Sequence, residues 1–259
     1  MFKEKKYFII YITLMFVLFM LPVDASTEYF DFTKLSQGVV SVNATVDGTM
    51  AVRITKENKN TDYIVKGLTQ LPLQHGNGEY TLYALKKING NQYKVVQTKK
   101  VTLRLEDPTV LYLQSVQKVE WSKDDVAIKK AEELTKEATT DQEKIRIIYD
   151  YIYDNVAYDY NKENQLTPSY LPNIDTTIAT GQGICYDYAS LYASMLRSQG
   201  IPTKLIMGRK DDIDQYHAWN QVYIKETQQW ITVDITYDVT TGKKELEKNA
   251  LSYIVENTY

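Results

Sequence analysis

Residues 181–192 read Gly181-Gln182-Gly183-Ile184-Cys185-Tyr186-Asp187-Tyr188-Ala189-Ser190-Leu191-Tyr192. The glycines end a loop, and the residues after them predict a helix that stops at Gly200-Ile201-Pro202. Cys185 therefore falls on the first turn of a helix, where unsatisfied N–H groups and the helix dipole stabilise a thiolate. Gly183 lets backbone and substrate approach closely, which would place the N–H of Cys185 to donate to an oxyanion.

Cys185 is the only cysteine in the 259 residues. A single cysteine forms no intramolecular disulfide, and a lone cysteine by itself more often packs as a small apolar residue than it reacts. One cysteine and two histidines also cannot supply a closed shell of four Cys and His ligands, so a structural zinc site is disfavoured. The residues around Cys185, and two blocks further along the chain, favour the reactive interpretation.

The first of these blocks is the alternating run 216–224, in which His217 and Trp219 share one face of a predicted strand. The second is the run 230–236, in which Asp234 shares a face with Trp230, Thr232 and Thr236. We expect a hairpin between them.

The expected hairpin loop is 225–228, which pairs Ile224 with Gln229 and places Trp219 opposite Asp234. His217 is then the diagonal neighbour of Asp234, at about 7 to 8 Å between centres, which is within reach of a hydrogen bond. A carboxylate so placed fixes the tautomer of a histidine and stabilises its imidazolium form.

Together these blocks resemble the transglutaminase-like superfamily, a branch of the papain-like fold. The resemblance is densest over 181–237, weaker from 140 to 255, and absent from the N-terminal part. The matching segments, in the family's order Cys, His, Asp, are Gly183-Ile184-Cys185-Tyr186-Asp187-Tyr188-Ala189, Met195 to Thr203, Met207-Gly208, His217-Ala218-Trp219-Asn220 and Trp230 to Thr236.

The resemblance implies that Cys185 is a nucleophile, His217 its base and Asp234 the acid that orients the histidine. It implies an α+β core, with helices packed on an antiparallel sheet, and acyl transfer through a thioester, with no cofactor and no metal. Peptidase, amidase and cross-linking activities remain open, because hydrolysis and transamidation share the triad. A catalytically silent fold that serves as a cell-surface binding or assembly module is the alternative.

Three further residues are candidates for the cleft around this triad. We expect Gln182 and Gly183 to border the oxyanion site, with Gln182 as a candidate second donor or else an ordinary turn residue. Trp219 either shapes the wall beside His217 or packs in the core. The family's usual proline after the aspartate is Ile235 here, and we expect the strand to continue through it.

The N-terminal half predicts a small β-sandwich. Residues 39–46 alternate as a strand, and residues 79–86, 93–97 and 100–105 predict three more strands, the first two joined in a hairpin at Asn89-Gly90. Residues 1–25 have the layout of a signal peptide, although an uncleaved anchor is the competing interpretation. We therefore divide the chain into a signal peptide (1–25), a β-rich domain (26–119) and a catalytic domain (120–259).

Composition limits the partners. The net charge of −3 and the absence of a long basic run exclude a typical nucleic-acid surface. The export signal predicts a secreted or extracellular protein, surface-associated or membrane-anchored if the N-terminal segment stays uncleaved. We expect a protein or peptide substrate, with cell-wall or surface proteins as candidates.

Overall fold

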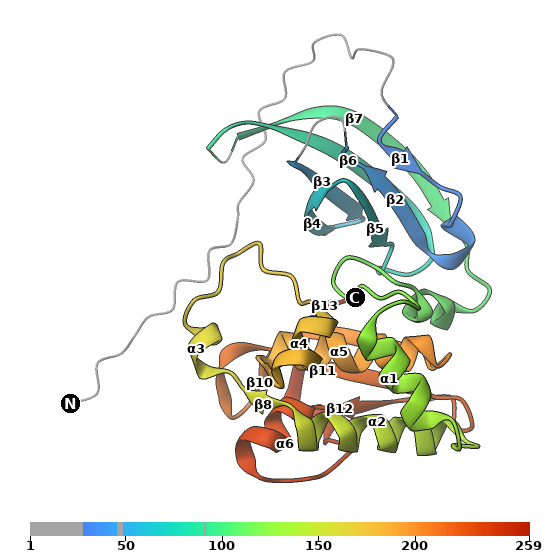
Figure 1. Ribbon diagram of the computed structural model, residues 1–259. Helices are drawn as coiled ribbons and strands as arrows, with labels where there is room; N and C mark the ends of the chain where they lie inside the picture. The colour runs from blue at the N-terminus through green and yellow to red at the C-terminus, as the bar shows by residue number, and fades with distance from the viewer. Residues whose placement is uncertain (1–27, 46–48, 91) are drawn as a thin grey trace.

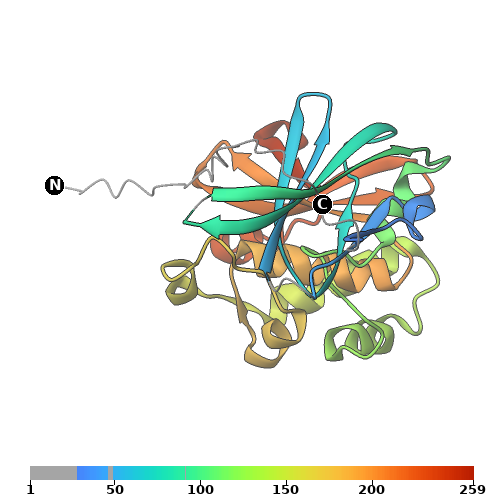
Figure 2. The same cartoon turned by 90° about the horizontal axis from the view of Figure 1, so that it is seen from above.

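The computed structural model describes residues 28–45, 49–90 and 92–259. A part built of strands lies above a part built of helices and strands in Figure 1, and Figure 2 shows the strands of the upper part lying across the lower one. The proposed signal peptide, residues 1–25, lies outside the described residues. Within the described ranges, none of the helices combines the length and the apolar character needed to cross a membrane.

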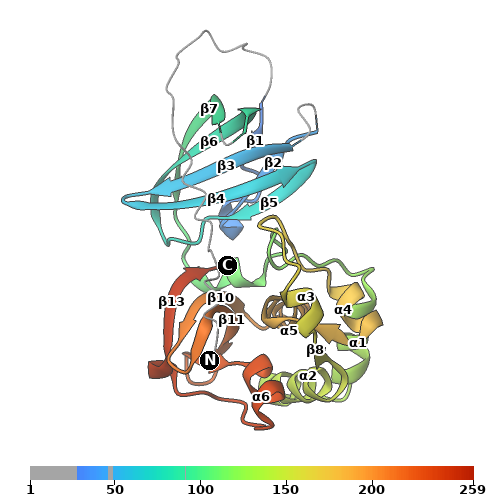
Figure 3. The same cartoon turned by 90° about the vertical axis from the view of Figure 1, so that its left-hand side faces the viewer.

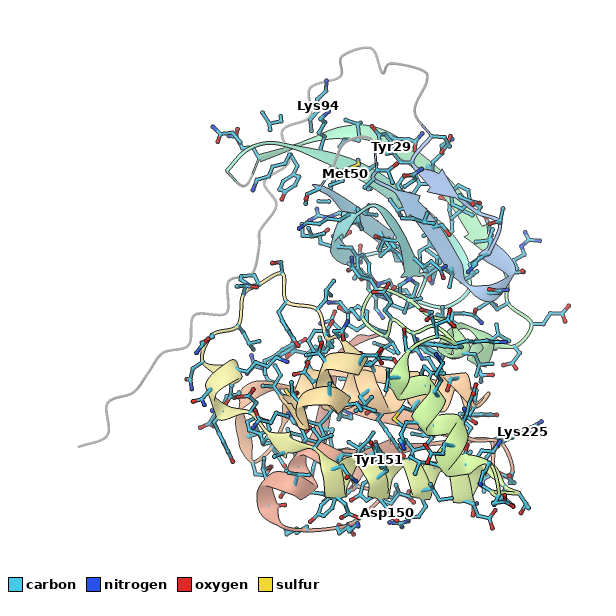
Figure 4. The ribbon with its side chains drawn as sticks, in the orientation of Figure 1. Tyr29, Met50, Lys94, Asp150, Tyr151 and Lys225 are labelled. Atoms are coloured by element: carbon cyan, nitrogen blue, oxygen red, sulfur yellow. The ribbon has the colours of Figure 1, made fainter. Side chains whose placement is uncertain are left out.

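The N-terminal part is a sandwich of two antiparallel sheets, of strand order β1-β2-β5 and β4-β3-β6-β7. Met50 lies inside it, fully buried (Figure 4). Its elements are β1 (Phe30–Asp31), a 3₁₀ turn η1 (Leu35–Gln37), β2 (Val39–Asn43), β3 (Thr49–Lys56), β4 (Lys59–Lys66), β5 (Leu68–Pro72), β6 (Gly78–Asn89) and β7 (Gln92–Leu103).

The hairpin expected at Asn89 is present, since Asn89 pairs with Gln92. The prediction of separate strands at 93–97 and 100–105 is wrong, because 93–97 and 100–103 belong to the single strand β7, which ends at Leu103. Its register against β6 shifts between Ala84 and Leu85, so β7 runs through a bulge as one continuous strand.

The C-terminal part is α+β, as expected, with an antiparallel sheet of order β12-β11-β10-β13 and its main helices on one side (Figure 3). Lys225, on the loop between β11 and β12, marks one end of this sheet (Figure 4). The elements are η2 (Pro108–Leu113), α1 (Val126–Thr135), α2 (Asp141–Asn155), β8 (Ala157–Tyr158), α3 (Tyr160–Glu163), α4 (Ile174–Thr180), β9 (Gln182–Gly183), α5 (Cys185–Ser198), β10 (Thr203–Lys210), β11 (Ile213–Ile224), β12 (Gln229–Val233), α6 (Ile235–Thr241), η3 (Ala250–Ser252) and β13 (Tyr253–Thr258).

Helix α5 is the central helix of this part. Its residues Ala189 and Ala193 are buried in one apolar cluster with Ala218 of β11, and these small side chains let helix and strand approach closely. The side chain of Asn220 fixes the contact by donating from Nδ2 to the carbonyl of Ala189 at 2.9 Å. The start of α5 is thereby held against the middle of β11.

The two parts share apolar core. Tyr63 of the sandwich packs edge-on against Tyr259, with ring centroids 6.3 Å apart, and both belong to a cluster that also contains Ala189 and Leu205. The backbone of Tyr259 pairs with that of Leu205 near the start of β10. The boundary at 119/120 stays a prediction, because this apolar cluster is continuous across it.

Candidate active site

Cys185 is the first residue of α5, as the sequence predicts, and its side chain is half-buried. The preceding residue, Ile184, is extended and belongs to the loop. The carboxylate of Asp187 accepts a hydrogen bond from the backbone N–H of Ile184 at 2.9 Å, which closes the first turn. The thiol therefore sits at the positive end of the helix dipole while remaining accessible.

Asp187 does more than close that turn. Its carboxylate is fully buried and also accepts from Nζ of Lys162 at 2.7 Å and from the hydroxyl of Tyr170. Both donors belong to the segment between β8 and α4. Because Asp187 lies two residues after Cys185, these bonds hold the segment against the first turn of α5.

Gly183 makes room for this carboxylate. A Cβ at Gly183 would lie 2.8 Å from Cβ of Asp187, closer than real side chains pack. Gln182, its partner in β9, is exposed and lines a cavity of about 450 Å³ together with Lys162 and Tyr170. The role of Gln182 at the oxyanion stays a prediction.

The hairpin that carries the other two candidates has the expected register, with Ile224 paired to Gln229 and Tyr223 to Trp230. His217 lies in the half of β11 that is remote from the hairpin loop, and Asp234 directly follows β12. Nε2 of His217 lies 2.8 Å from Oδ2 of Asp234, and both side chains are buried.

The ring of His217 lies between an acid and the thiol. Burial alone would lower the pKa of His217, but the charge and hydrogen bond of Asp234, together with the nearby Cys185, outweigh it and raise the pKa to about 10. Because Nε2 is engaged by Asp234, Nδ1 is the nitrogen left for the sulfur. A ring with this pKa is protonated at neutral pH, and a positive charge beside a cysteine favours its thiolate form.

The backbone at Asp234 does not continue as the expected strand. It is the N-cap residue of α6, and its Oδ1 accepts from the N–H of Tyr237 at 3.0 Å, so β12 ends at Val233 and no strand continues through Ile235. The expectation of a continuing strand is wrong because an aspartate is a strong N-cap. Ile235 is the first helical residue, a position that suits a proline equally well, so its departure from the family pattern leaves the backbone unchanged.

Two tyrosines that the sequence did not single out complete the site. The hydroxyl of Tyr253, in β13, donates to Oδ2 of Asp234 at 3.1 Å. Tyr158, in β8, has its pKa raised by burial and then by the nearby Cys185, so its hydroxyl stays protonated at neutral pH. No local pattern identifies either residue, because both reach the site through long-range strand placement.

Trp219 forms a wall of the site. Its ring stacks on that of His217 at 6.1 Å between centroids and packs against Tyr253 at 5.0 Å. A Cβ at Gly208 would lie 2.0 Å from the carbonyl oxygen of Ile254 and 3.0 Å from the indole, so the glycine on β10 leaves room for both the backbone of β13 and the indole. Trp219 is only 1% exposed, so it both packs in the core and contacts the imidazole.

Comparisons with known proteins point to one family. The model of the transglutaminase-like superfamily core matches residues 128–235. No curated protein sequence matches the chain significantly. Among solved structures, a candidate cysteine protease from Cytophaga hutchinsonii is 14% identical, with a TM-score of 0.48, over 85% of this chain and 79% of its own.

Two other solved structures are similar to this chain, at comparable sequence identity. The periplasmic domain of TgpA from Pseudomonas aeruginosa is 16% identical, with a TM-score of 0.42, over 78% of this chain and 70% of its own. Red sea bream transglutaminase is 12% identical, with a TM-score of 0.32, over 76% of this chain and 48% of its own. The region 128–235 that matches the transglutaminase-like superfamily model holds Cys185, His217 and Asp234.

Proposed function

We propose that this protein is an exported, cysteine-dependent acyl-transfer enzyme in which Cys185, His217 and Asp234 act as a catalytic triad. The observation that carries the proposal is the 2.8 Å contact between His217 and Asp234, on a ring whose other nitrogen is left for the half-buried Cys185. A histidine held in this way takes and returns one proton without changing its orientation.

In the proposed reaction the Cys185 thiolate attacks the carbonyl carbon of a peptide bond or carboxamide. A C–S bond forms, and the carbonyl oxygen becomes an oxyanion that the N–H of Cys185 can stabilise. The C–N bond then breaks as imidazolium His217 gives its proton to the departing amine. Water attacks the resulting thioester while His217 takes a proton, and the acid and the free thiolate are released.

Asp234 keeps its charge throughout this cycle. It accepts from His217, from Tyr253 and from the backbone of Tyr237, so donors occupy both oxygens and none of them needs to move. A fixed anion in a buried position stabilises the imidazolium more than a solvated one would.

We favour hydrolysis of peptide bonds in surface or wall proteins, with water as the acceptor. An amine such as a lysine side chain would attack the same thioester and cross-link instead. A silent binding module is the less favoured alternative, because the placement of His217 against a buried carboxylate has no evident benefit for binding alone.

Mass spectrometry of a peptide library incubated with the protein, with and without an added primary amine, tests the proposal. New carboxyl termini or deamidated glutamines indicate hydrolysis, and amine adducts indicate transamidation. Cys185→Ala should abolish every product. A library left unchanged by the unaltered protein, or one processed equally by Cys185→Ala, would overturn the proposal.

A further inference from the structure

A cavity of about 470 Å³ lies where the two parts of the molecule meet. Strands β3 to β5 of the sandwich form one wall, with Ile64 and Gln70 among its residues. The turn at 115–118 forms another wall, and residues 168–171 form the third. This volume is enough for a few residues of an extended polypeptide.

The cavity is linked to the start of α5. Tyr170, one of its lining residues, donates its hydroxyl to Asp187 and packs edge-on against Tyr186, with ring centroids 6.2 Å apart. Tyr186 directly follows Cys185 in the sequence. A chain bound in the cavity would therefore lie beside the helix end that presents the thiol.

Lys118 gives the cavity its distinctive chemistry. Its Nζ lies 4.8 Å from the ring centroid of Tyr259 and 5.6 Å from that of Tyr186. Among the described residues, no carboxylate forms an ion pair with it. Burial lowers the pKa of Lys118 to about 8, which leaves most of the ammonium charged at neutral pH.

The other charges of the cavity leave Lys118 uncompensated. Asp62 is already engaged by Arg53, with Nε to Oδ1 at 2.7 Å. Glu120 and Lys66 are exposed, so water screens both of them. The two aromatic rings stabilise the ammonium in part, but Lys118 is half-buried, and a partly desolvated cation without an anion carries a cost that a bound carboxylate would relieve.

The position of Lys118 is fixed by the backbone around it. Gln117 donates from Nε2 to the carbonyl of Ile64 at 2.7 Å, and the hydroxyl of Ser190 donates to the carbonyl of Lys118 at 3.1 Å. The turn is thus bonded to the sandwich on one side and to α5 on the other. The backbone of this turn is therefore held in place before a ligand binds, and only the side chain of Lys118 loses freedom on binding.

We propose that this cavity is a substrate subsite for a polypeptide segment with an acidic side chain, and that Lys118 is the residue that selects it. The inference rests on the proposed function, since it names the substrate class of the same site. It also gives the β-sandwich a role as the wall that encloses the substrate next to the cysteine.

Binding can be measured apart from chemistry in the Cys185→Ala protein. Two fluorescein-labelled decapeptide pools serve as probes, each with a central glutamine, one flanked by Glu and small residues and the other by Lys and small residues. We expect the acidic pool to bind at least tenfold more tightly by fluorescence anisotropy, and Lys118→Met to remove this preference. Lys118→Arg, which keeps the charge, should retain most of it.

Lys204→Met is the matched control. Lys204 is also desolvated, with a pKa lowered to about 8, and its Nζ lies 3.7 Å over the ring of Trp230, but it lines neither cavity described above. This variant should bind the two pools as the parent does. A melting curve of each variant shows that the fold is kept.

The outcomes separate the two proposals. A Cys185→Ala protein that binds the acidic pool through Lys118 supports the subsite even if the unaltered protein turns over nothing, in which case the enzyme proposal fails. Equal binding of both pools, or a folded Lys118→Met variant with an undiminished acidic preference, overturns the subsite even if turnover is observed.

Discussion

Replacing Asp234 with asparagine changes one atom at the centre of the site. The oxygen that accepts from the N–H of Tyr237 can stay, and asparagine is as good an N-cap as aspartate, so α6 should form as before. The atom facing Nε2 of His217 becomes either an amide nitrogen, which donates where it must accept, or a neutral oxygen. The fold should therefore survive while the chemistry suffers.

The size of the effect follows from the contacts that are lost. An amide that donates to Nε2 moves the ring proton to Nδ1, the nitrogen that must take a proton from the thiol. In a triad the wrong tautomer lowers turnover by up to about 10⁴-fold. At 1.36 kcal/mol per decade, a loss between about 10² and 10⁴ corresponds to about 3 to 5 kcal/mol of transition-state stabilisation.

The assay need not wait for a substrate. Iodoacetamide reacts with thiolate, so the alkylation rate at pH 6 reports how far His217 stabilises the charged sulfur. We expect Cys185 to react much faster than free cysteine in the unaltered protein and at least tenfold more slowly in Asp234→Asn. Peptide turnover, once a substrate is found, should fall by a factor between about 10² and 10⁴.

A stability measurement tests the positive charge of His217 independently of the alkylation assay. The folded pKa of His217 is raised to about 10 from an ordinary value of 6.5. This group therefore stabilises the fold fully below pH 6.5 and loses that contribution as the pH rises towards 10. The difference in unfolding free energy between the unaltered protein and Asp234→Asn should shrink over this window. If alkylation, turnover and this pH dependence are all unchanged in the variant, Asp234 is no member of a triad.

Four other substitutions probe the rest of the site. Cys185→Ala should abolish turnover and shift the thermal midpoint by no more than a few degrees, because it removes one half-buried sulfur; a large loss of stability would instead mark an inert core cysteine. Tyr158→Phe should lower kcat by about 10-fold to 10³-fold if its hydroxyl donates to the oxyanion, and Gln182→Ala should then change little; the reverse pattern would restore Gln182 as the donor. Asp187→Asn should raise KM more than it lowers kcat, because an amide accepts at only one position, so either Tyr170 or Lys162 loses its acceptor on α5; equal effects on both constants would show that Asp187 only stabilises the helix.

Much of the site could be predicted because its signals are local. The start of α5 follows from glycines before an apolar helical pattern, and the register of the β11–β12 hairpin follows from two alternating runs at a fixed separation. Contacts between distant segments had no such signal. Tyr253 reaches Asp234 from β13 only after that strand pairs with β10, and Lys162 reaches Asp187 from a short helix whose position depends on the whole α+β part.

At the start of α1, the local capping signal did not supply the partner of the free backbone N–H groups. At α1, Ser122 and Asp125 predict a capping box, and the two do bond, with the N–H of Ser122 donating to Asp125 at 2.8 Å. The free N–H groups of Val126 and Ala127 nevertheless donate to Asp175, which comes from the start of α4. A tertiary partner replaced the local one because α1 and α4 pack side by side.

Asp234 shows most directly why the fold and the proposed chemistry depend on each other. Its Oδ1 caps α6, and its Oδ2 accepts hydrogen bonds from His217 and Tyr253. One carboxylate therefore starts a helix directly after a strand and also orients the imidazole. The cap fixes the side-chain rotamer before any substrate arrives, which is what a pre-organised orienting acid requires. A glutamate would reach too far to cap from that position, so Asp234→Glu should impair both the start of α6 and the alignment of His217, even though it preserves the charge.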